Sequence, residues 1–192
     1  QFTREPGSRW GCLADWVDVP NVYAAGRLDA DSEGLLILTE NGRLQQRLTD
    51  PRFGHWRTYW VQVEGLVEDS QLTALEQGVV IKGQSTRPAQ ATFLDASHWR
   101  DLPERTPPIR VRRSIPTSWL SISLREGRNR QIRRMTAAVG LPTLRLIRRS
   151  IDLMDSEPPL SLEGLAPGQW RPVKPAEQER LKALLRTQGA RR

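Results

Sequence analysis

The alternation of apolar and polar positions along the chain predicts short strands interleaved with short helices. In residues 119–124, leucine or isoleucine stands at every second position with serine between, which predicts a strand buried on one face only. Residues 58–65 are rich in aromatic and β-branched residues and predict a second strand. Residues 35–39 form a continuous apolar run, typical of a buried strand.

The complete pattern predicts more strands than helices. We expect strands over residues 22–25, 35–39, 58–65, 79–81, 89–94, 119–124 and 143–147. We expect helices over residues 43–48, 69–77, 130–139 and 176–186. Because strands occur both in tandem and between helices, the predicted fold class is α+β with a mixed, mostly antiparallel sheet. Pro88 predicts that the strand after it lies at a sheet edge or begins there.

Composition narrows the class of protein. The 192 residues suffice to bury a core, as one domain or as one domain in two lobes. No stretch approaches the ~20 apolar residues that span a bilayer, and no signal peptide opens the sequence. The single Cys12 excludes an internal disulfide and a cysteine zinc site. We expect a soluble, cytoplasmic protein without a metal. Because the sequence begins with Gln1 and not with methionine, we also expect a truncated N-terminus.

The basic residues point to a polyanionic partner. The net charge is +7, and only three of the 29 basic residues are lysines. A GC-rich genome explains part of this ratio, but not why the arginines concentrate between residues 110 and 149. Guanidinium groups bind phosphates through two parallel hydrogen bonds and stack on bases. Together with seven tryptophans, this pattern favours single-stranded or looped RNA.

A glycine-bounded acidic loop is the first candidate for chemistry. Asp29, Asp31 and Glu33 lie between Gly26 and Gly34, directly before the apolar run. Their spacing nearly fits a calcium-binding EF-hand loop, but the segments on both sides do not predict the helices that such a loop requires. A carboxylate here can cap a turn, or it can face a cleft and act as nucleophile or general base.

The arginine-rich segment 126–135 is the second candidate. At 100° per residue, one face of its helix carries Ile132, Met135, Thr136 and Val139 and should pack on the sheet. The arginines at 130 and 134 point the other way, either into solvent or toward phosphates. The arginine at 133 lies at the edge of the buried face, where it requires a carboxylate partner.

These segments resemble the pseudouridine synthase family, and within it the RsuA/RluE branch. The first motif is Gly26-Arg27-Leu28-Asp29 with the following Ser32-x-Gly34-Leu35-Leu36-x-Leu38-Thr39 and Asn41-Gly42. The second is Arg57-x-Tyr59-x-Val61, and the third is the segment Glu126-Gly127-Arg128-Asn129-Arg130-Gln131-Ile132-Arg133-Arg134-Met135. The stretch from Ser114 to Arg148 is especially similar to the large-subunit RluE type. The resemblance covers roughly residues 22–173.

The resemblance implies an assignment for each candidate residue. Asp29 matches the catalytic aspartate, Tyr59 the active-site tyrosine and Arg133 the arginine that pairs with that aspartate. From the residues alone, an ordinary core aromatic of a strand is the favoured interpretation of Tyr59, because strands are enriched in tyrosine. For RNA binding we expect seven arginines: Arg27, Arg112, Arg113, Arg128, Arg130, Arg134 and Arg148.

The resemblance also implies the architecture and the partner. We expect residues 1–192 to form a single catalytic domain of two lobes with the cleft between them, lacking the preceding strand and the S4-type domain of many relatives. The implied partner is 23S ribosomal RNA, the implied localisation is cytoplasmic, and we expect a monomer without metal or cofactor.

The implied reaction breaks the N1–C1′ bond of a uridine, rotates the base and rejoins it through C5. One ionised carboxylate can act as a nucleophile on the sugar or base, or as a base at C2′ through a glycal-like intermediate; the residues leave both routes open. The target base must first leave its helix, which costs roughly a few kcal/mol. Two alternatives remain from the residues alone: a non-catalytic RNA-binding module, and a glycosidase that uses the acidic loop.

Overall fold

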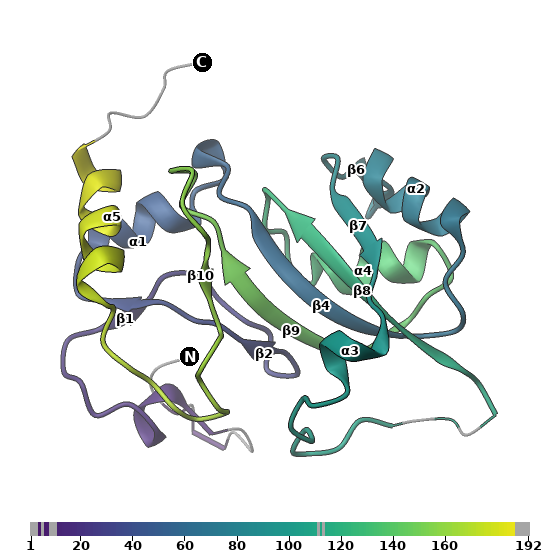
Figure 1. Cartoon of the computed structure of the whole chain (residues 1–192), viewed down its shortest axis with the longest axis horizontal. Coiled ribbons are helices and arrows are strands. Elements are labelled where there is room, and N and C mark those ends of the chain that lie inside the picture. The colour runs from purple at the N-terminus through teal and green to yellow at the C-terminus, as the bar shows by residue number, and fades with distance from the viewer. Residues whose placement is uncertain (1–3, 5, 8–10, 111, 113, 187–192) are drawn as a thin grey trace.

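A six-stranded sheet forms the centre of the molecule (Figure 1). The chain is described from a computed structural model, which places residues 4, 6–7, 11–110, 112 and 114–186. The main path of the sheet runs β10–β9–β4–β8–β7, and β2 pairs with β9 beside it. All of these pairs are antiparallel except β2–β9, which is parallel, so the prediction of a mixed, mostly antiparallel sheet is confirmed. The strands are β2 (Glu33–Gly34), β4 (Arg57–Glu64), β7 (Gln90–Phe93), β8 (Thr117–Leu124), β9 (Thr143–Ile151) and β10 (Leu160–Ser161).

Short elements surround this sheet. Two further strand pairs are β1 (Tyr23–Ala24) with β3 (Leu38–Thr39), and β5 (Val80–Ile81) with β6 (Gln84–Ser85). The helices are α1 (Gly42–Thr49), α2 (Asp69–Gln77), α3 (Ala96–Trp99), α4 (Gln131–Ala138) and α5 (Pro175–Arg186), with 3₁₀ turns η1 (Leu13–Asp15) and η2 (Pro51–Phe53). Among the residues that the structure describes, no helix has the length and apolarity to cross a membrane.

Local signals in the sequence explain where the helices begin and end. The Asn41 side chain accepts a hydrogen bond from the backbone N–H of Leu44 and caps the start of α1. Gly78 follows α2 with a φ of 92°, a conformation that favours glycine, and stops the helix as predicted. The four predicted helices are therefore confirmed with small shifts of their ends.

Two hydrophobic clusters divide the interior into two lobes. The larger cluster lies between the sheet and helices α2 and α4, and includes Val61, Leu120 and Met135. The smaller cluster lies between α1, α5 and the far end of β9, and includes Leu48 and Leu181. Figure 1 shows α1 and α5 side by side at one end of the sheet and α2 at the other.

The prediction of one continuous strand over residues 35–39 is wrong. The chain instead changes its partner within this run: β2 ends at Gly34 beside β9, and β3 begins at Leu38 beside β1. Between them, the backbone N–H of Leu35 donates to the carbonyl of Arg148, and the carbonyl of Ile37 accepts from Ala25. The run is buried as expected, but its backbone hydrogen bonds are shared between two sheets.

The strand over residues 119–124 is confirmed as part of β8, but it is buried on both faces rather than one. Ser123 is only 8% exposed, and a 2.9 Å hydrogen bond between its hydroxyl and the hydroxyl of Thr58 on β4 satisfies this buried polar group. Trp119, on the same face, stacks on Trp99 in a third hydrophobic cluster. Alternation predicted a strand here correctly, but the serines do not mark a solvated face.

Candidate active site

The acidic loop is joined to the sheet by a close backbone approach. Gly34 has a φ of 121°, and a Cβ atom at this position would collide with the backbone of Arg148 on β9. Only glycine therefore allows the parallel pairing of β2 with β9 at this point. Asp29 lies five residues before Gly34, so this pairing positions the loop that carries the carboxylate beside the sheet.

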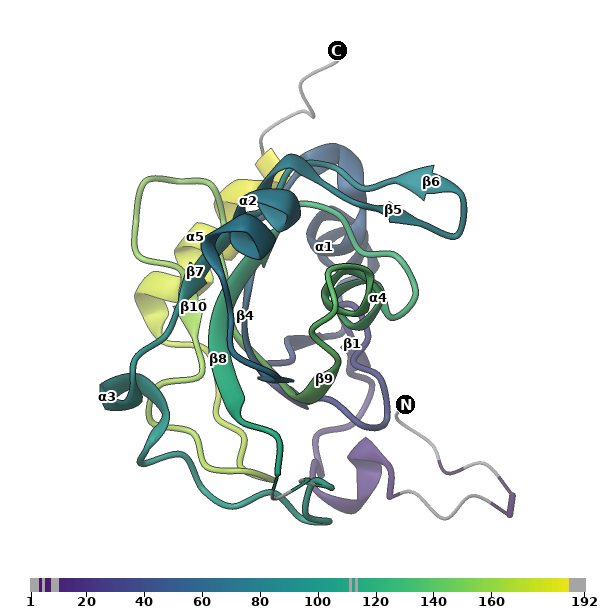
Figure 2. The same cartoon turned by 90° about the vertical axis from the view of Figure 1, so that its right-hand side faces the viewer.

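Helix α4 lies across from this loop, on the same side of the sheet (Figure 2). Ile132, Met135 and Thr136 are buried against the larger hydrophobic cluster, as the helical periodicity predicted. Arg130, which precedes the helix, and Arg134 point away from that face. The N-terminal end of α4 therefore brings its arginines toward the acidic loop.

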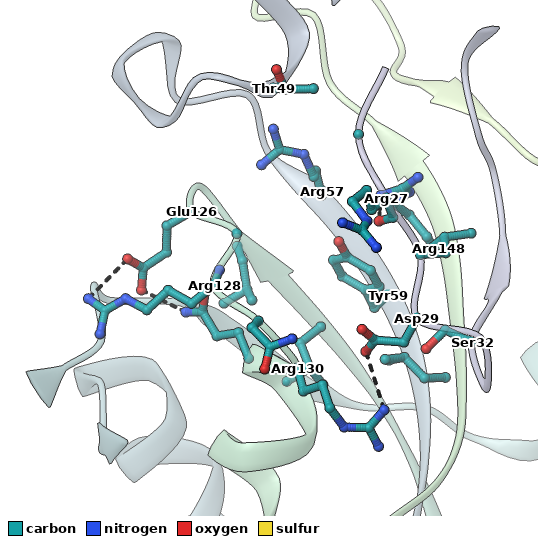
Figure 3. A pocket seen from close by; sticks show the side chains of 18 of the residues that line it. Arg27, Asp29, Ser32, Thr49, Arg57, Tyr59, Glu126, Arg128, Arg130 and Arg148 are labelled. Carbon is teal, nitrogen blue, oxygen red and sulfur yellow. Dashed lines mark hydrogen bonds and ion pairs between the residues drawn. The ribbon is translucent and has the colours of Figure 1, made fainter. Parts of the chain in front are cut away.

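A cavity of about 600 Å³ opens between the loop, the sheet and the start of α4. Asp29 and Tyr59 both line it, together with the apolar side chains of Ile132 and Leu146 (Figure 3). The cavity lies where the two lobes meet: Ile132 and Leu146 of its lining belong to the larger cluster, and Gly26 and Thr49 directly follow Ala25 and Leu48 of the smaller one. A cleft between two lobes was expected from the sequence.

The carboxylates and arginines of the site pair differently from the expectation. Arg130 binds Asp31 through two parallel hydrogen bonds of 3.0 Å, and its Nη1 lies 3.8 Å from Asp29 Oδ2. Arg133 Nη2 donates to the backbone carbonyl of Asp31 at 2.8 Å and lies 3.4 Å from its carboxylate. Arg133 was expected to pair with Asp29; its carboxylate partner is instead Asp31.

Burial and neighbouring charges shift the pKa values of Asp31 and Arg133 in opposite directions. Partial burial by itself would raise the pKa of Asp31, but the hydrogen bonds from Arg130 and the charges of Arg133 and Arg130 hold it below its usual value. Burial lowers the pKa of Arg133, whose side chain is 11% exposed, and the charge of Asp31 opposes this effect. Asp31 thus compensates two arginines, while Asp29 has, among the described residues, one ion pair, the 3.8 Å contact to Arg130.

The family follows from comparison with known proteins. Residues 15–138 match the model of the RNA pseudouridylate synthase family. A relative from Xanthomonas campestris pv. campestris, named ribosomal large subunit pseudouridine synthase E, is 54% identical over 83% of this chain and 81% of its own length. The chain belongs to the RNA pseudouridylate synthase family. Its members isomerise uridine, so the chain is an enzyme rather than a glycosidase or a passive RNA-binding module.

Two more comparisons agree with this family. A protein of the same name from Vibrio vulnificus is 49% identical over 90% of this chain and 69% of its own length. A crystal structure described as a pseudouridylate synthase superposes with a TM-score of 0.70 at 28% identity, over 88% of this chain and 65% of that chain. The present chain therefore has the pseudouridine synthase fold that its sequence motifs implied.

The structure separates the seven arginines that were expected to bind RNA. Four of them line the pocket of this pseudouridylate synthase: Arg27, Arg128, Arg130 and Arg148. Arg134 does not line it and donates to the side chain of Asn129. Arg112 lies at the opposite end of β4 from the pocket, where it faces Glu64 at 3.6 Å. Arg113 lies outside the described residues.

One arginine of the pocket was given no role by the sequence analysis, although it begins the second motif. Arg57 lines the cavity two residues before Tyr59 on β4. Because side chains alternate along a strand, Arg57 shares a face with Tyr59, and this spacing was the signal that could have identified it. Glu126 was also missed as a pocket residue; it is buried and accepts hydrogen bonds from Gln131 and the backbone of Arg87.

The third acidic residue of the loop has a different role from the first two. Glu33 receives two hydrogen bonds from Arg145, of 2.8 and 2.9 Å, and faces Arg105 at 3.4 Å. The loop is flanked by β1 and β2, whereas a calcium-binding loop of the EF-hand type lies between two helices. Each acidic side chain of the loop therefore faces arginine, and Glu33 holds β9 and the segment around Arg105 together.

Proposed function

We propose that this chain converts a uridine of 23S ribosomal RNA to pseudouridine, with Asp29 as the catalytic carboxylate. The observation that carries the proposal is that Asp29 and Tyr59 line one cavity at the meeting of the two lobes. The Asp29 side chain is 29% exposed, so it is within reach of a nucleotide in that cavity. Arginines at the opening supply positive charge for an RNA backbone.

The pairing of the neighbouring carboxylate supports this role for Asp29. A carboxylate held by two parallel hydrogen bonds from a guanidinium is a weaker nucleophile and base, because its lone pairs are occupied. Asp31 takes both of these bonds from Arg130, which leaves Asp29 with a single contact of 3.8 Å. Asp29 therefore keeps a carboxylate whose lone pairs are available to attack the ribose or base, or to remove a proton.

The wall of the cavity suits an extruded base. Tyr59 offers the face of its ring, and the apolar side chains of Ile132 and Leu146 lie beside it. Stacking on an aromatic ring is worth roughly 1–3 kcal/mol per base, which offsets much of the energy needed to unstack the base from its helix. We assign Tyr59 the role of receiving the base, and Arg133 the role of holding the loop that carries Asp29.

The names of the relatives support large-subunit ribosomal RNA as the substrate. The two relatives described above, from Xanthomonas and Vibrio, are both named ribosomal large subunit pseudouridine synthase E, and this chain covers more than two thirds of each. We also propose that the chain acts in the cytoplasm as a monomer, without metal or cofactor. Isomerisation of uridine involves no net oxidation or hydrolysis, so the carboxylate and the pocket suffice for it.

Incubation of the purified chain with unmodified transcripts of 23S and 16S RNA tests the substrate. Pseudouridine keeps a carbodiimide adduct after alkaline treatment, and the adduct stops reverse transcriptase. We expect a new stop at a uridine of the 23S transcript and none in the 16S transcript. A stop only in the 16S transcript, or none in either, contradicts the proposal. The variant Glu40→Gln, an exposed carboxylate near the same loop, is the matched control and should retain activity.

A further inference from the structure

Two arginines form part of the sheet side of the pocket and are almost completely buried. Arg57 on β4 is 9% exposed and Arg148 on β9 is 3% exposed, and both line the same cavity as Asp29. Arg148 is paired with Tyr59 across the two strands, and Arg57 precedes Tyr59 by two residues. Figure 3 shows both guanidinium groups near the hydroxyl end of the Tyr59 ring. We call Arg57 and Arg148 the sheet arginines.

Neutral backbone oxygens are the hydrogen-bond partners of the sheet arginines. Arg57 Nη2 donates to the carbonyl of Leu48 at 2.7 Å. Arg148 Nε donates to the carbonyl of Leu35 at 2.7 Å, and its Nη1 to that of Arg27 at 3.4 Å. Arg148 Nη2 is buried and has no hydrogen-bond partner. Among the residues that the structure describes, no carboxylate lies within ion-pairing distance of either guanidinium.

This arrangement is electrostatically costly for the protein alone. A buried cation without an anionic partner loses its hydration and gains no Coulomb energy in return. The two positive charges also repel each other: burial lowers the pKa of Arg57, and the charge of Arg148 contributes to the same effect. An anion bound between the two guanidinium groups would remove both costs and would satisfy the free N–H groups of Arg148.

The position of the sheet arginines indicates which anion fits. Their planar N–H groups match a tetrahedral phosphate, which accepts hydrogen bonds in several directions. Tyr59 and Asp29 lie in the same cavity, so a nucleotide whose base contacts Tyr59 and whose ribose approaches Asp29 carries its phosphate into this neighbourhood. We propose that Arg57 and Arg148 bind the phosphate group attached to the ribose of the target uridine. This inference rests on the proposed function, because it assumes that the pocket receives a uridine.

Binding of small nucleotides tests this subsite without any turnover. The full chain is titrated by calorimetry with uridine, uridine 5′-monophosphate, uridine 3′-monophosphate and inorganic phosphate. We expect at least one of the monophosphates to bind about tenfold more tightly than uridine, because its charged phosphate accepts hydrogen bonds that uridine cannot accept. Inorganic phosphate should bind more weakly than that monophosphate. Equal binding of uridine and both monophosphates, or no binding of any, overturns the proposal.

Variants identify the residues that recognise the phosphate. Arg57→Gln should remove the preference for the monophosphate, whereas Arg57→Lys, which keeps the charge but not the planar fork, should retain part of it. Arg100→Gln is the matched control, because Arg100 is exposed and does not line the pocket. A melting curve of each variant verifies that it is folded. An unchanged preference in folded Arg57→Gln, or inorganic phosphate binding as tightly as the monophosphates, overturns the assignment.

The two proposals fail in different ways. If the wild-type chain makes no pseudouridine in ribosomal RNA but prefers uridine monophosphate through Arg57, the proposed substrate is wrong and the phosphate subsite stands. If pseudouridine forms but the monophosphate preference is absent, the subsite is wrong and the proposed function stands.

Discussion

The arginines on the two sides of the pocket differ in whether a carboxylate accompanies them. On the α4 side, Arg130 and Arg133 both contact Asp31, and Arg130 also lies near Asp29. On the sheet side, Arg57 and Arg148 donate their hydrogen bonds to backbone carbonyls, and no carboxylate of the described residues pairs with either. The α4 side is therefore already compensated within the protein, while the sheet side has positive charge left for a ligand.

This difference indicates how the positive charge of one pocket is divided. An arginine that is paired with a carboxylate stabilises the structure of the protein. If this arginine bound a phosphate instead, the carboxylate would be left unpaired. An arginine without such a partner gains Coulomb energy only when an anion arrives. We expect substitutions on the α4 side to disturb the geometry of the reaction, and substitutions on the sheet side to disturb the binding of substrate.

The largest effect is expected at the carboxylate itself. Asp29→Asn should lower kcat by at least about 10³-fold, because the amide is neither a nucleophile nor a base. RNA binding should change by no more than about twofold, since the variant keeps the shape of the loop. Single-turnover kinetics with the 23S transcript and filter binding measure the two quantities. Asp31→Asn provides the comparison: a loss as large as that of Asp29→Asn would contradict the separate roles of the two carboxylates.

A smaller effect is expected at Arg133. Arg133→Ala should lower kcat by about 10²-fold with little change in KM, because its contacts to the backbone and carboxylate of Asp31 position the loop. Arg134→Ala is the control on the same helix, since Arg134 contacts only Asn129 and does not line the pocket. A rise in KM without a fall in kcat would place Arg133 with the substrate-binding arginines instead.

Arg130 combines features of the α4 side and the sheet side, because it pairs with a carboxylate but is also exposed to substrate. It is exposed and lines the pocket, but it is held by Asp31. Arg130→Ala should weaken RNA binding by about three- to tenfold and reduce the slope of log affinity against log salt by about one. Filter binding at several salt concentrations measures both. An unchanged slope would mean that Asp31 keeps Arg130 away from phosphates also in the complex.

The smallest effect is expected at an arginine–carboxylate ion pair outside the pocket. This pair is a reference for the compensated arginines of the α4 side. Arg171 donates two hydrogen bonds to Glu177 at the start of α5, and these bonds lower the pKa of Glu177 to about 2. Because this pKa lies below the usual 4.5, the stabilisation is complete above about pH 4.5 and is lost as the pH falls toward 2. Glu177→Gln should cost about 1–2 kcal/mol near pH 7, after allowance for solvent screening.

Urea unfolding of the wild type and of Glu177→Gln at pH 7, 4.5 and 3 measures this dependence. The difference in unfolding free energy between the two proteins should be largest at pH 7, slightly smaller at pH 4.5, where half of the unfolded chains have Glu177 protonated, and smallest at pH 3. A difference that grows toward acid pH would have the wrong sign and would contradict the assigned pKa.

The sequence predicted the secondary structure well where local rules decide it. Periodicity identified the buried face of α4, and Gly78 and Asn41 marked helix ends, because these features depend on neighbouring residues only. The run 35–39 was predicted as one strand because apolar character reports burial but not the identity of the hydrogen-bonding partner. Its division between two sheets depends on β1 and β9, which are distant in the sequence.

The same limit applies to the site. The motifs brought Asp29, Tyr59 and Arg133 to one region, but the partner of Arg133 depends on a difference of a few ångströms between two carboxylates of one loop. Arg148 was expected to bind RNA, but nothing in the sequence indicated that it is only 3% exposed, because arginine is rarely buried. Arg57 was quoted as part of a motif but given no role, although its spacing from Tyr59 on a strand indicated that the two share a face.

The attachment of Gly34 to β9 has a consequence for insertions and deletions in this enzyme. Gly34 is fixed against the sheet. The number of residues between Gly34 and Asp29 therefore determines the position of the Asp29 carboxylate in the cavity. Lengthening or shortening that spacer by a single residue would shift the acid along the cavity wall while the rest of the fold stayed intact. Insertions and deletions should therefore be excluded from these five peptide units.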